Sequence, residues 1–362
     1  MKAITNIEFL KNIFLLTLLL LSTSTIIGQE EEEEEKKPLS ITGSVDAYYK
    51  ANLNAPNNEN IAPGSSFANL DGFALGMANL IVAYEGDKVG AVADLVFGPR
   101  GTDAIFNSPQ YSATGNIINQ LYAYWNVSDK VKLTLGNFNT FLGYEVISPT
   151  GNFNYSTSFL FSSGPFSHTG IKADFAISED FSLMLAVMNP TDLTEFNSSN
   201  GSYAYGAQLG YSGQYLNLLI DDGGLGFEVD YTGGFDLSDS FFLGINGAYQ
   251  TANTEITVGT TTNEISSGFY GFALYPQLAT SDSFSIGLRG EYFGTHVEDV
   301  DDLPSVLALT LTGSYAINNL TIKPEIRLDS WSNVEGAEPF VDSDGMPLDN
   351  LSSVYLAAIY SF

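Results

Sequence analysis

Few side chains in this sequence could carry out catalysis. The chain has no cysteine and only two histidines, His168 and His296. A serine hydrolase needs a serine beside a histidine. Ser167 directly precedes His168, but neighbouring residues on a strand point to opposite faces. Two histidines without cysteines also give no conventional zinc site. We therefore predict no enzymatic activity and no cofactor.

Two acidic clusters could bind Ca²⁺, because this cation takes oxygen ligands. One cluster lies between Glu298 and Asp302, and the other contains an Asp-x-Asp-Gly motif at residues 342–345. The motif lacks the full spacing and the terminal glutamate of an EF-hand loop. The candidate ligands are Asp299, Asp301, Asp302, Asp342 and Asp344. The simpler interpretation of both clusters is a solvated surface loop.

Charged residues alternate with apolar residues in three segments, at 168–177, 284–292 and 320–329. A period of two places the two kinds of residue on opposite faces of a strand. In a membrane barrel, Leu288 and Ile326 would face lipid and the charged residues would face the lumen. The predicted lumen residues are Lys172, Asp174, Arg289, Glu291, Lys323, Glu325, Arg327 and Asp329. A half-buried sheet of a soluble protein alternates in the same way, so other features of the chain must distinguish a membrane barrel from a soluble sheet.

Sixteen segments of this kind follow one another after residue 40. They are 41–53, 73–84, 89–97, 117–127, 131–145, 168–177, 181–188, 202–211, 215–220, 227–235, 241–250, 266–278, 284–293, 306–316, 320–331 and 353–362. Tight polar turns and longer links mostly alternate between them, which is the plan of bacterial outer-membrane barrels. We therefore predict an all-β fold, a transmembrane antiparallel β-barrel of about 16 strands with short periplasmic turns and long extracellular loops.

The two ends of the chain predict export to the outer membrane. Lys2 and Lys11 precede an apolar run that is too short for a comfortable membrane helix, and small and polar residues follow, as in a secretory signal. We assign residues 1–28 to a signal peptide, 29–38 to a flexible acidic segment and 39–362 to one barrel domain. The last strand alternates as far as Phe362, which resembles the C-terminal signal that barrel-assembly machinery recognises.

A long aromatic segment between residues 146 and 167 interrupts the pattern of strands. It contains the turn-forming residues Gly, Pro, Asn and Ser, but it has too many aromatic residues to remain fully exposed to water. We predict that it folds back into the lumen and narrows the channel, with His168 anchoring it through a hydrogen bond. The residues assigned to this constriction are Phe153, Tyr155, Phe159, Phe161, Phe166 and His168.

Three motifs in and around this segment carry a family resemblance. They are Gly-x-Phe-x-Thr-x-x-Gly-Tyr-Glu at 136–145, Asn-Tyr-Ser-x-Ser-x-Leu-Phe at 154–161 and Pro-Phe-x-His-Thr-Gly at 165–170. Together they resemble the OmpL-like β-barrel porins of Bacteroidota-type outer membranes, and the resemblance implies a porin. The chain departs from the pattern at Asn137 and Thr157, where the family often has arginine.

The predicted function is an outer-membrane porin for the passive diffusion of small hydrophilic solutes and ions. Its net charge of −29 excludes nucleic acid as a partner and favours modest cation selectivity. The predicted partners are outer-membrane lipid, the barrel-assembly machinery and small solutes, and a homo-oligomer is left open. The alternative is a surface binding or adhesion barrel with a plugged lumen, and an outer-membrane hydrolase ranks third.

Overall fold

The computed structural model describes residues 39–58, 60–105, 117–196, 202–258 and 261–362, so the predicted signal peptide and acidic segment lie outside it.

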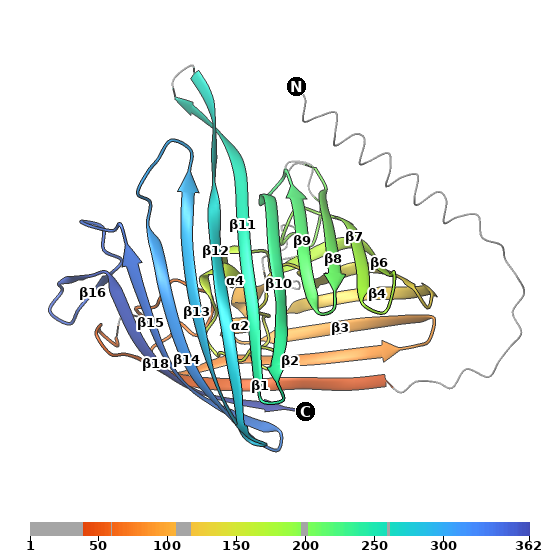
Figure 1. Cartoon of the computed structure of the whole chain (residues 1–362), viewed down its shortest axis with the longest axis horizontal. Helices are drawn as coiled ribbons and strands as arrows, with labels where there is room; N and C mark the ends of the chain where they lie inside the picture. Colours follow the sequence, from red (N-terminus) through yellow and green to blue (C-terminus); the bar gives the residue numbers. More distant parts are fainter. Residues whose placement is uncertain (1–38, 59, 106–116, 197–201, 259–260) are drawn as a thin grey trace, which may run out of the picture. The chain divides into compact units, whose positions relative to one another are not determined.

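Within the described residues, sixteen antiparallel strands close into a barrel (Figure 1). Each strand pairs with its neighbours in chain order, and the first strand pairs with the last to close the ring. The strands are β1 (Leu39–Asn52), β2 (Gly72–Glu85), β3 (Val89–Phe97), β4 (Ile118–Ser128), β5 (Val131–Asn139), β6 (Ser167–Ala176), β7 (Phe181–Met188), β8 (Ala204–Tyr211), β9 (Gln214–Asp221), β10 (Gly226–Ser238), β11 (Phe241–Val258), β12 (Thr261–Ser281), β13 (Phe284–Val297), β14 (Ser305–Ile317), β15 (Leu320–Ser332) and β18 (Asn350–Ser361). Every predicted strand overlaps one of these, so the predicted fold is confirmed.

The alternation of side chains along the strands places apolar residues on the outer surface of the barrel and polar residues inside. On β15, Ile326 is 55% exposed, whereas its neighbour Glu325 is 2% exposed. On β13, Leu288 is likewise exposed on the outside and Arg289 is buried inside. An apolar outer surface suits contact with lipid, because lipid offers no partners for polar groups.

Among the residues that the structure describes, no helix has the length and apolar character needed to cross a membrane. Two short helices, α2 (Pro99–Ala104) and α4 (Phe159–Ser163), lie in the links after β3 and β5. A small hairpin of β16 (Phe340–Val341) and β17 (Pro347–Leu348) lies between β15 and β18.

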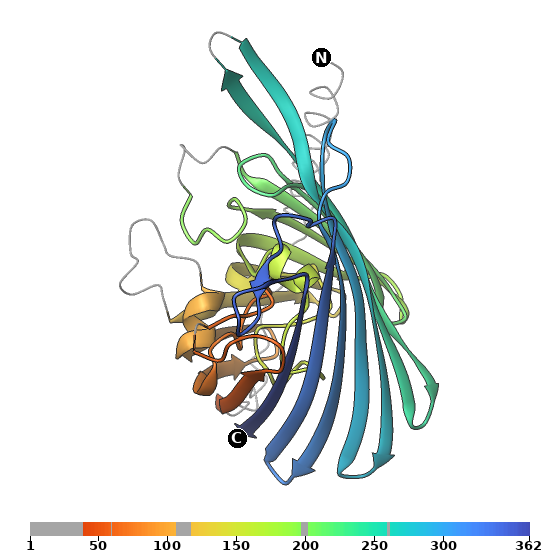
Figure 2. The ribbon, with the colours of Figure 1, turned by 90° about the vertical axis from the view of Figure 1, so that its left-hand side faces the viewer.

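The largest differences from the predicted strands occur at two places. β5 ends at Asn139 instead of residue 145, because the chain leaves the wall there and Gly143 adopts a positive φ of 83° in the link. Residues 251–258 and 261–265, predicted to lie in a loop, instead continue the β11–β12 ladder, with Asn253 paired to Ser266. This stretch is rich in threonine and isoleucine, which favour extended backbone, and the hairpin projects beyond its neighbours (Figure 2).

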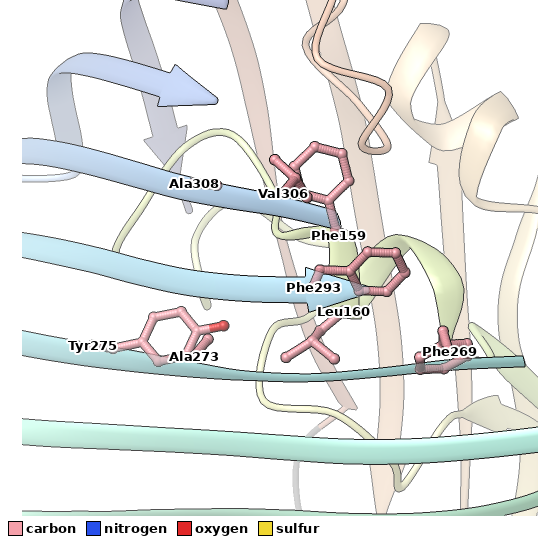
Figure 3. Close-up of a cluster of buried hydrophobic side chains, with 8 residues drawn as sticks. All are labelled: Phe159, Leu160, Phe269, Ala273, Tyr275, Phe293, Val306 and Ala308. Atoms are coloured by element: carbon pink, nitrogen blue, oxygen red, sulfur yellow. The ribbon is translucent and has the colours of Figure 1, made fainter. Parts of the chain in front are cut away.

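The largest apolar cluster of the interior forms where α4 meets the wall (Figure 3). Phe159 and Leu160 of α4 pack against inner side chains of β12, β13 and β14, and the ring centroids of Phe159 and Phe293 are 5.9 Å apart. Ser158 caps the helix by accepting a hydrogen bond from the Phe161 amide at 3.0 Å. The barrel is therefore filled in part by a packed segment and not by strand side chains alone.

Arginine introduced on the outer surface should destabilise the barrel much more than arginine on the open part of the inner surface. We expect Ile326→Arg to cost about 2–4 kcal/mol if the position lies near the bilayer midplane. Asp174→Arg is the matched control, because Asp174 lies on the inner face of β6 with 38% of its side chain exposed. A refolding titration in lipid vesicles measures both, and equal losses would show that the assigned faces are wrong.

Candidate pore constriction

The link between β5 and β6 crosses the inside of the barrel. We call residues 140–166 the interior segment. Its Gly143 amide donates to Asp230 Oδ1 of β10 at 3.0 Å, and its Asn154 Nδ2 donates to Thr312 Oγ1 of β14 at 2.7 Å. The Tyr155 hydroxyl donates to Asp46 Oδ2 of β1 at 2.6 Å. Since these strands lie at separate places around a closed ring, the segment that joins them must pass through the lumen.

Carboxylates of the wall bind the main-chain amides of the interior segment. Glu325 on β15 accepts from the amides of Tyr155 at 2.7 Å and Ser156 at 3.0 Å. Glu291 on β13 accepts from the amides of Phe159 at 3.0 Å and Leu160 at 2.8 Å. Hydrogen bonds to an ionised carboxylate are stronger than those between neutral groups, so each glutamate fixes two consecutive residues of the segment.

Basic side chains of the wall bind the carbonyl groups of the same segment. Arg289 donates to the Ser156 carbonyl at 2.6 Å, to the Thr157 carbonyl at 3.2 Å and to Glu145 Oε1 at 2.7 Å. Arg327 donates to the Thr157 carbonyl at 2.8 Å and forms an ion pair with Asp329 at 2.8 Å. Most of the groups that these arginines and glutamates bind in the segment are main-chain amides and carbonyls, so the wall holds chiefly the backbone of the segment.

Six of the eight predicted lumen residues are therefore covered by the interior segment. They point inward, but they are buried and do not line an open channel. They are Arg289, Glu291, Lys323, Glu325, Arg327 and Asp329. The alternation along a strand predicts which side chains point into the barrel. It does not predict their burial, because the segment that covers them comes from another part of the chain.

The other two predicted lumen residues, Lys172 and Asp174, remain in contact with water. They form an ion pair on β6 with a separation of 3.2 Å, and their side chains are 25% and 38% exposed. Around the sixteen-stranded ring, β6 lies eight strands from β14, on the opposite side of the barrel. The inner wall is therefore solvated at these two positions of β6, on the side away from the strands that bind Asn154 and α4.

The aromatic residues assigned to the constriction are buried in contacts between segments, and most do not face open space. Phe161 stacks on Phe166 with ring centroids 4.9 Å apart, and both lie beside Phe67. Tyr155 is fully buried, 5.5 Å from the ring of Tyr48. These rings therefore stabilise the fold of the segment and do not line open space.

His168 is buried on β6, where its Nε2 lies 3.0 Å from Thr140 Oγ1. This contact joins the first residue of the interior segment to the strand that follows it. On the other side of the junction, the amides of Phe166 and Ser167 donate to Asp192 Oδ1 at 2.9 and 2.8 Å. Burial raises the pKa of Asp192, in the link after β7, to about 6, although the two amides oppose this shift.

Two basic residues that the sequence analysis did not single out also hold the interior. Arg100 of α2 donates to the carbonyls of Ile147 at 2.8 Å and Tyr155 at 3.2 Å. Lys50 on β1 forms an ion pair with Asp71 at 2.6 Å and so fixes the link between β1 and β2. No local signal in the sequence indicates these two roles, because the chain has 13 basic residues and others of them, such as Lys88 and Lys130, are exposed in turns.

The candidate calcium ligands lie in two links, after β13 and between β16 and β17. Within the described part of the chain, no three or more acidic or histidine side chains are grouped to hold a metal ion. Asp299, Asp301 and Asp302 are exposed in the link after β13. Asp342 Oδ1 accepts from the amides of Asp344 and Met346, both at 2.8 Å, and so shapes the turn between β16 and β17. The calcium sites stay a prediction, and the contacts of Asp342 are those of a turn.

The barrel resembles solved porins and channels of outer membranes. It matches the outer membrane channel DcaP of Acinetobacter baumannii with a TM-score of 0.58 and 13% identity, covering 90% of this chain and 97% of that chain. The trimer form of OmpT of Vibrio cholerae gives 0.56 and 10%, covering 90% and 99%. An anion-selective porin from Comamonas acidovorans gives 0.56 and 11%, with the same coverage. At these identities the likeness shows the fold.

No curated protein matches the chain. A family model does match, and it spans residues 38–362, which is nearly the whole sequence and includes the entire barrel. The predicted family and the outer-membrane location are thereby confirmed. This protein is an outer-membrane porin and belongs to the family described as putative beta-barrel porin-2, OmpL-like.

Proposed function

We propose that the barrel lets small hydrophilic solutes and ions diffuse through a water-filled path beside the interior segment. The observation that carries this proposal is the partial exposure of Lys172 and Asp174 on the inner wall of β6. An ion pair in a dry interior is costly, whereas here both side chains reach water on the side opposite β14. The interior segment then sets the width of the path.

We further propose modest cation selectivity. The chain as a whole has 42 acidic and 13 basic residues. Arg289 and Arg327 are buried, bound to the interior segment and paired with Glu145 and Asp329, so their positive charges are compensated. Exposed acids such as Asp299, Asp301 and Asp302 lie at the long-loop end. Their negative potential concentrates cations at that mouth.

The reversal potential across a salt gradient in a planar bilayer tests this selectivity. We expect a cation-selective sign that weakens with added salt, because the Debye length falls from about 10 Å at 0.1 M to about 3 Å at 1 M. Replacing Asp299, Asp301 and Asp302 by asparagine should reduce the potential at low salt. The corresponding triple glutamate variant keeps the charge and should behave like the native chain. An anion-selective sign would refute the proposal.

A barrel with a plugged lumen is the second candidate, because the centre of the interior segment is completely buried. Thr157, Ser158 and Tyr155 have essentially no exposed surface. Stepwise openings in single-channel recordings support the porin with a solute path. A folded barrel that inserts without conducting would favour a surface binding or adhesion role.

We also propose the route by which the chain reaches the membrane. The predicted signal peptide, residues 1–28, would direct export, and 29–38 would remain a flexible lead-in. The C-terminal strand β18 has an exposed apolar outer face that includes Leu356 and Tyr360, followed by the terminal Phe362. This face is the proposed contact for the barrel-assembly machinery and then for outer-membrane lipid. A homo-oligomer would use other parts of the outer surface.

A further inference from the structure

A cavity of about 410 Å³ lies between the interior segment and the barrel wall, towards the short-turn end. Tyr144 and Phe153 of the interior segment line it from one side. Phe242 and Thr321 line it from the wall, and each lies close to a short turn. The volume falls within the range of pockets that hold small organic molecules.

The three aromatic rings of this cavity are each seated over a glycine. A Cβ atom built on Gly287 would overlap the ring of Phe153, and one built on Gly234 would overlap the ring of Phe242. Gly244 makes the same room for Tyr144, whose ring stacks on Tyr275 with centroids 4.3 Å apart. The rings are therefore held in defined positions by contacts with the wall.

The polar groups of the cavity are almost all neutral. Hydroxyl and amide side chains line it, and the described residues around it include no carboxylate. The neutral polar side chains are Thr150, Asn152, Gln277, Ser314, Thr321 and Ser361. This composition contrasts with the acidic surface of the barrel and gives a cation no oxygen-rich charged site.

Lys323 is the one charged residue that lines the cavity. Its Nζ donates to the carbonyl of Pro149 at 3.0 Å and to the carbonyl of Asn152. An ammonium group has three donors, so one remains for a hydroxyl oxygen in the cavity. No second charged group is present to pair with a zwitterion, and the lysine is already largely engaged.

We propose that this cavity is a binding site for a neutral sugar ring of hexose size that enters the barrel from its short-turn end. The C–H faces of such a ring are apolar and can pack on Phe153 and Phe242. Its hydroxyl groups both donate and accept, which suits the neutral polar side chains around it. The proposal deepens the proposed function, because it names a class among the solutes that the porin would pass.

Isothermal titration of the full barrel in detergent with glucose tests the proposal directly. We expect saturable binding that weakens at least tenfold in Phe242→Ala and in Phe153→Ala. Phe235→Ala is the matched control, because Phe235 lies near the same end of the barrel with its ring on the outer surface. Sorbitol, which has one hydroxyl group more than glucose but no ring face, should bind at least tenfold more weakly than glucose.

Measuring conductance together with glucose binding distinguishes failure of the sugar site from failure of the proposed solute path. A barrel that conducts ions but binds no glucose, or binds glucose and sorbitol equally, overturns the sugar site and leaves the porin. A barrel that binds glucose with the expected dependence on Phe242 but never conducts overturns the solute path and leaves the sugar site. Binding that is unchanged in both alanine variants places the sugar elsewhere and also refutes the site.

Discussion

A barrel in which residues 152–163 are replaced by a short Gly-Ser linker should conduct severalfold more current than the native chain. This part of the interior segment carries α4 and the main-chain groups that Glu291, Glu325 and Arg327 bind. Its removal leaves those side chains facing water, which can hydrate them. Single-channel recording measures the change, and the mobility of the unboiled protein on a gel reports whether the barrel remains folded.

Replacing residues 254–265 by the same linker is the control for this experiment. This segment is equally long, but its described residues, 254–258 and 261–265, form the projecting end of the β11–β12 hairpin beyond the paired residues Asn253 and Ser266. We expect its loss to leave the conductance nearly unchanged. If the two deletions have equal effects, the interior segment does not set the width of the path. If only the first deletion abolishes the folded barrel, the segment is a structural plug.

Replacement of Arg289 by methionine should release the interior segment while the barrel stays closed. Arg289 is fully buried, binds the carbonyls of Ser156 and Thr157, and pairs with Glu145 at 2.7 Å. Removing one partner of a buried ion pair costs about 3–5 kcal/mol, because the other charge is left uncompensated. Hydrogen exchange should show lost protection at residues 155–160, and recordings should show fluctuating currents where the native chain gives steady ones.

Two variants decide whether that effect comes from the contacts of Arg289. Addition of Glu145→Gln removes the uncompensated carboxylate and should restore part of the protection. Lys172→Met removes another inner-wall base, but one that pairs with Asp174 at 3.2 Å. It should leave protection at residues 155–160 unchanged. Equal loss of protection in Lys172→Met and Arg289→Met would mean that the net charge of the lumen, and not a specific contact, holds the segment.

The strands could be predicted because their signal is local. A period of two distinguishes the two faces of a strand wherever it occurs, and the turns between strands are rich in polar residues. This was enough to place Ile326 outside and Glu325 inside. The same pattern could not predict that Glu325 is buried while the side chain of Asp174 reaches water. Both residues point inward, and their burial depends on where a distant segment packs.

The contacts of the interior segment could not be predicted from such local patterns. Its aromatic content indicated that it packs on something, but no periodicity identified the partners. Glu145 was expected to end a strand, and it is instead bound to Arg289, 144 residues along the chain. The helix α4 is five residues long, too short for a helical pattern to emerge from the sequence. Contacts of this kind form because closure of the barrel brings together residues that are far apart in the sequence.

The position of the interior segment in the chain also constrains the order of assembly. The segment lies between β5 and β6, yet Tyr155 binds Glu325, which is 170 residues away. Contacts so distant in sequence form slowly, because a long loop of chain must first be brought together. The docking of residues 154–160 on Glu291, Glu325 and Arg327 cannot be completed before β13 and β15 have joined the sheet. The nascent chain therefore passes through a stage in which most of the wall is formed and the docking is incomplete, and we expect its completion to be the last and slow step of maturation.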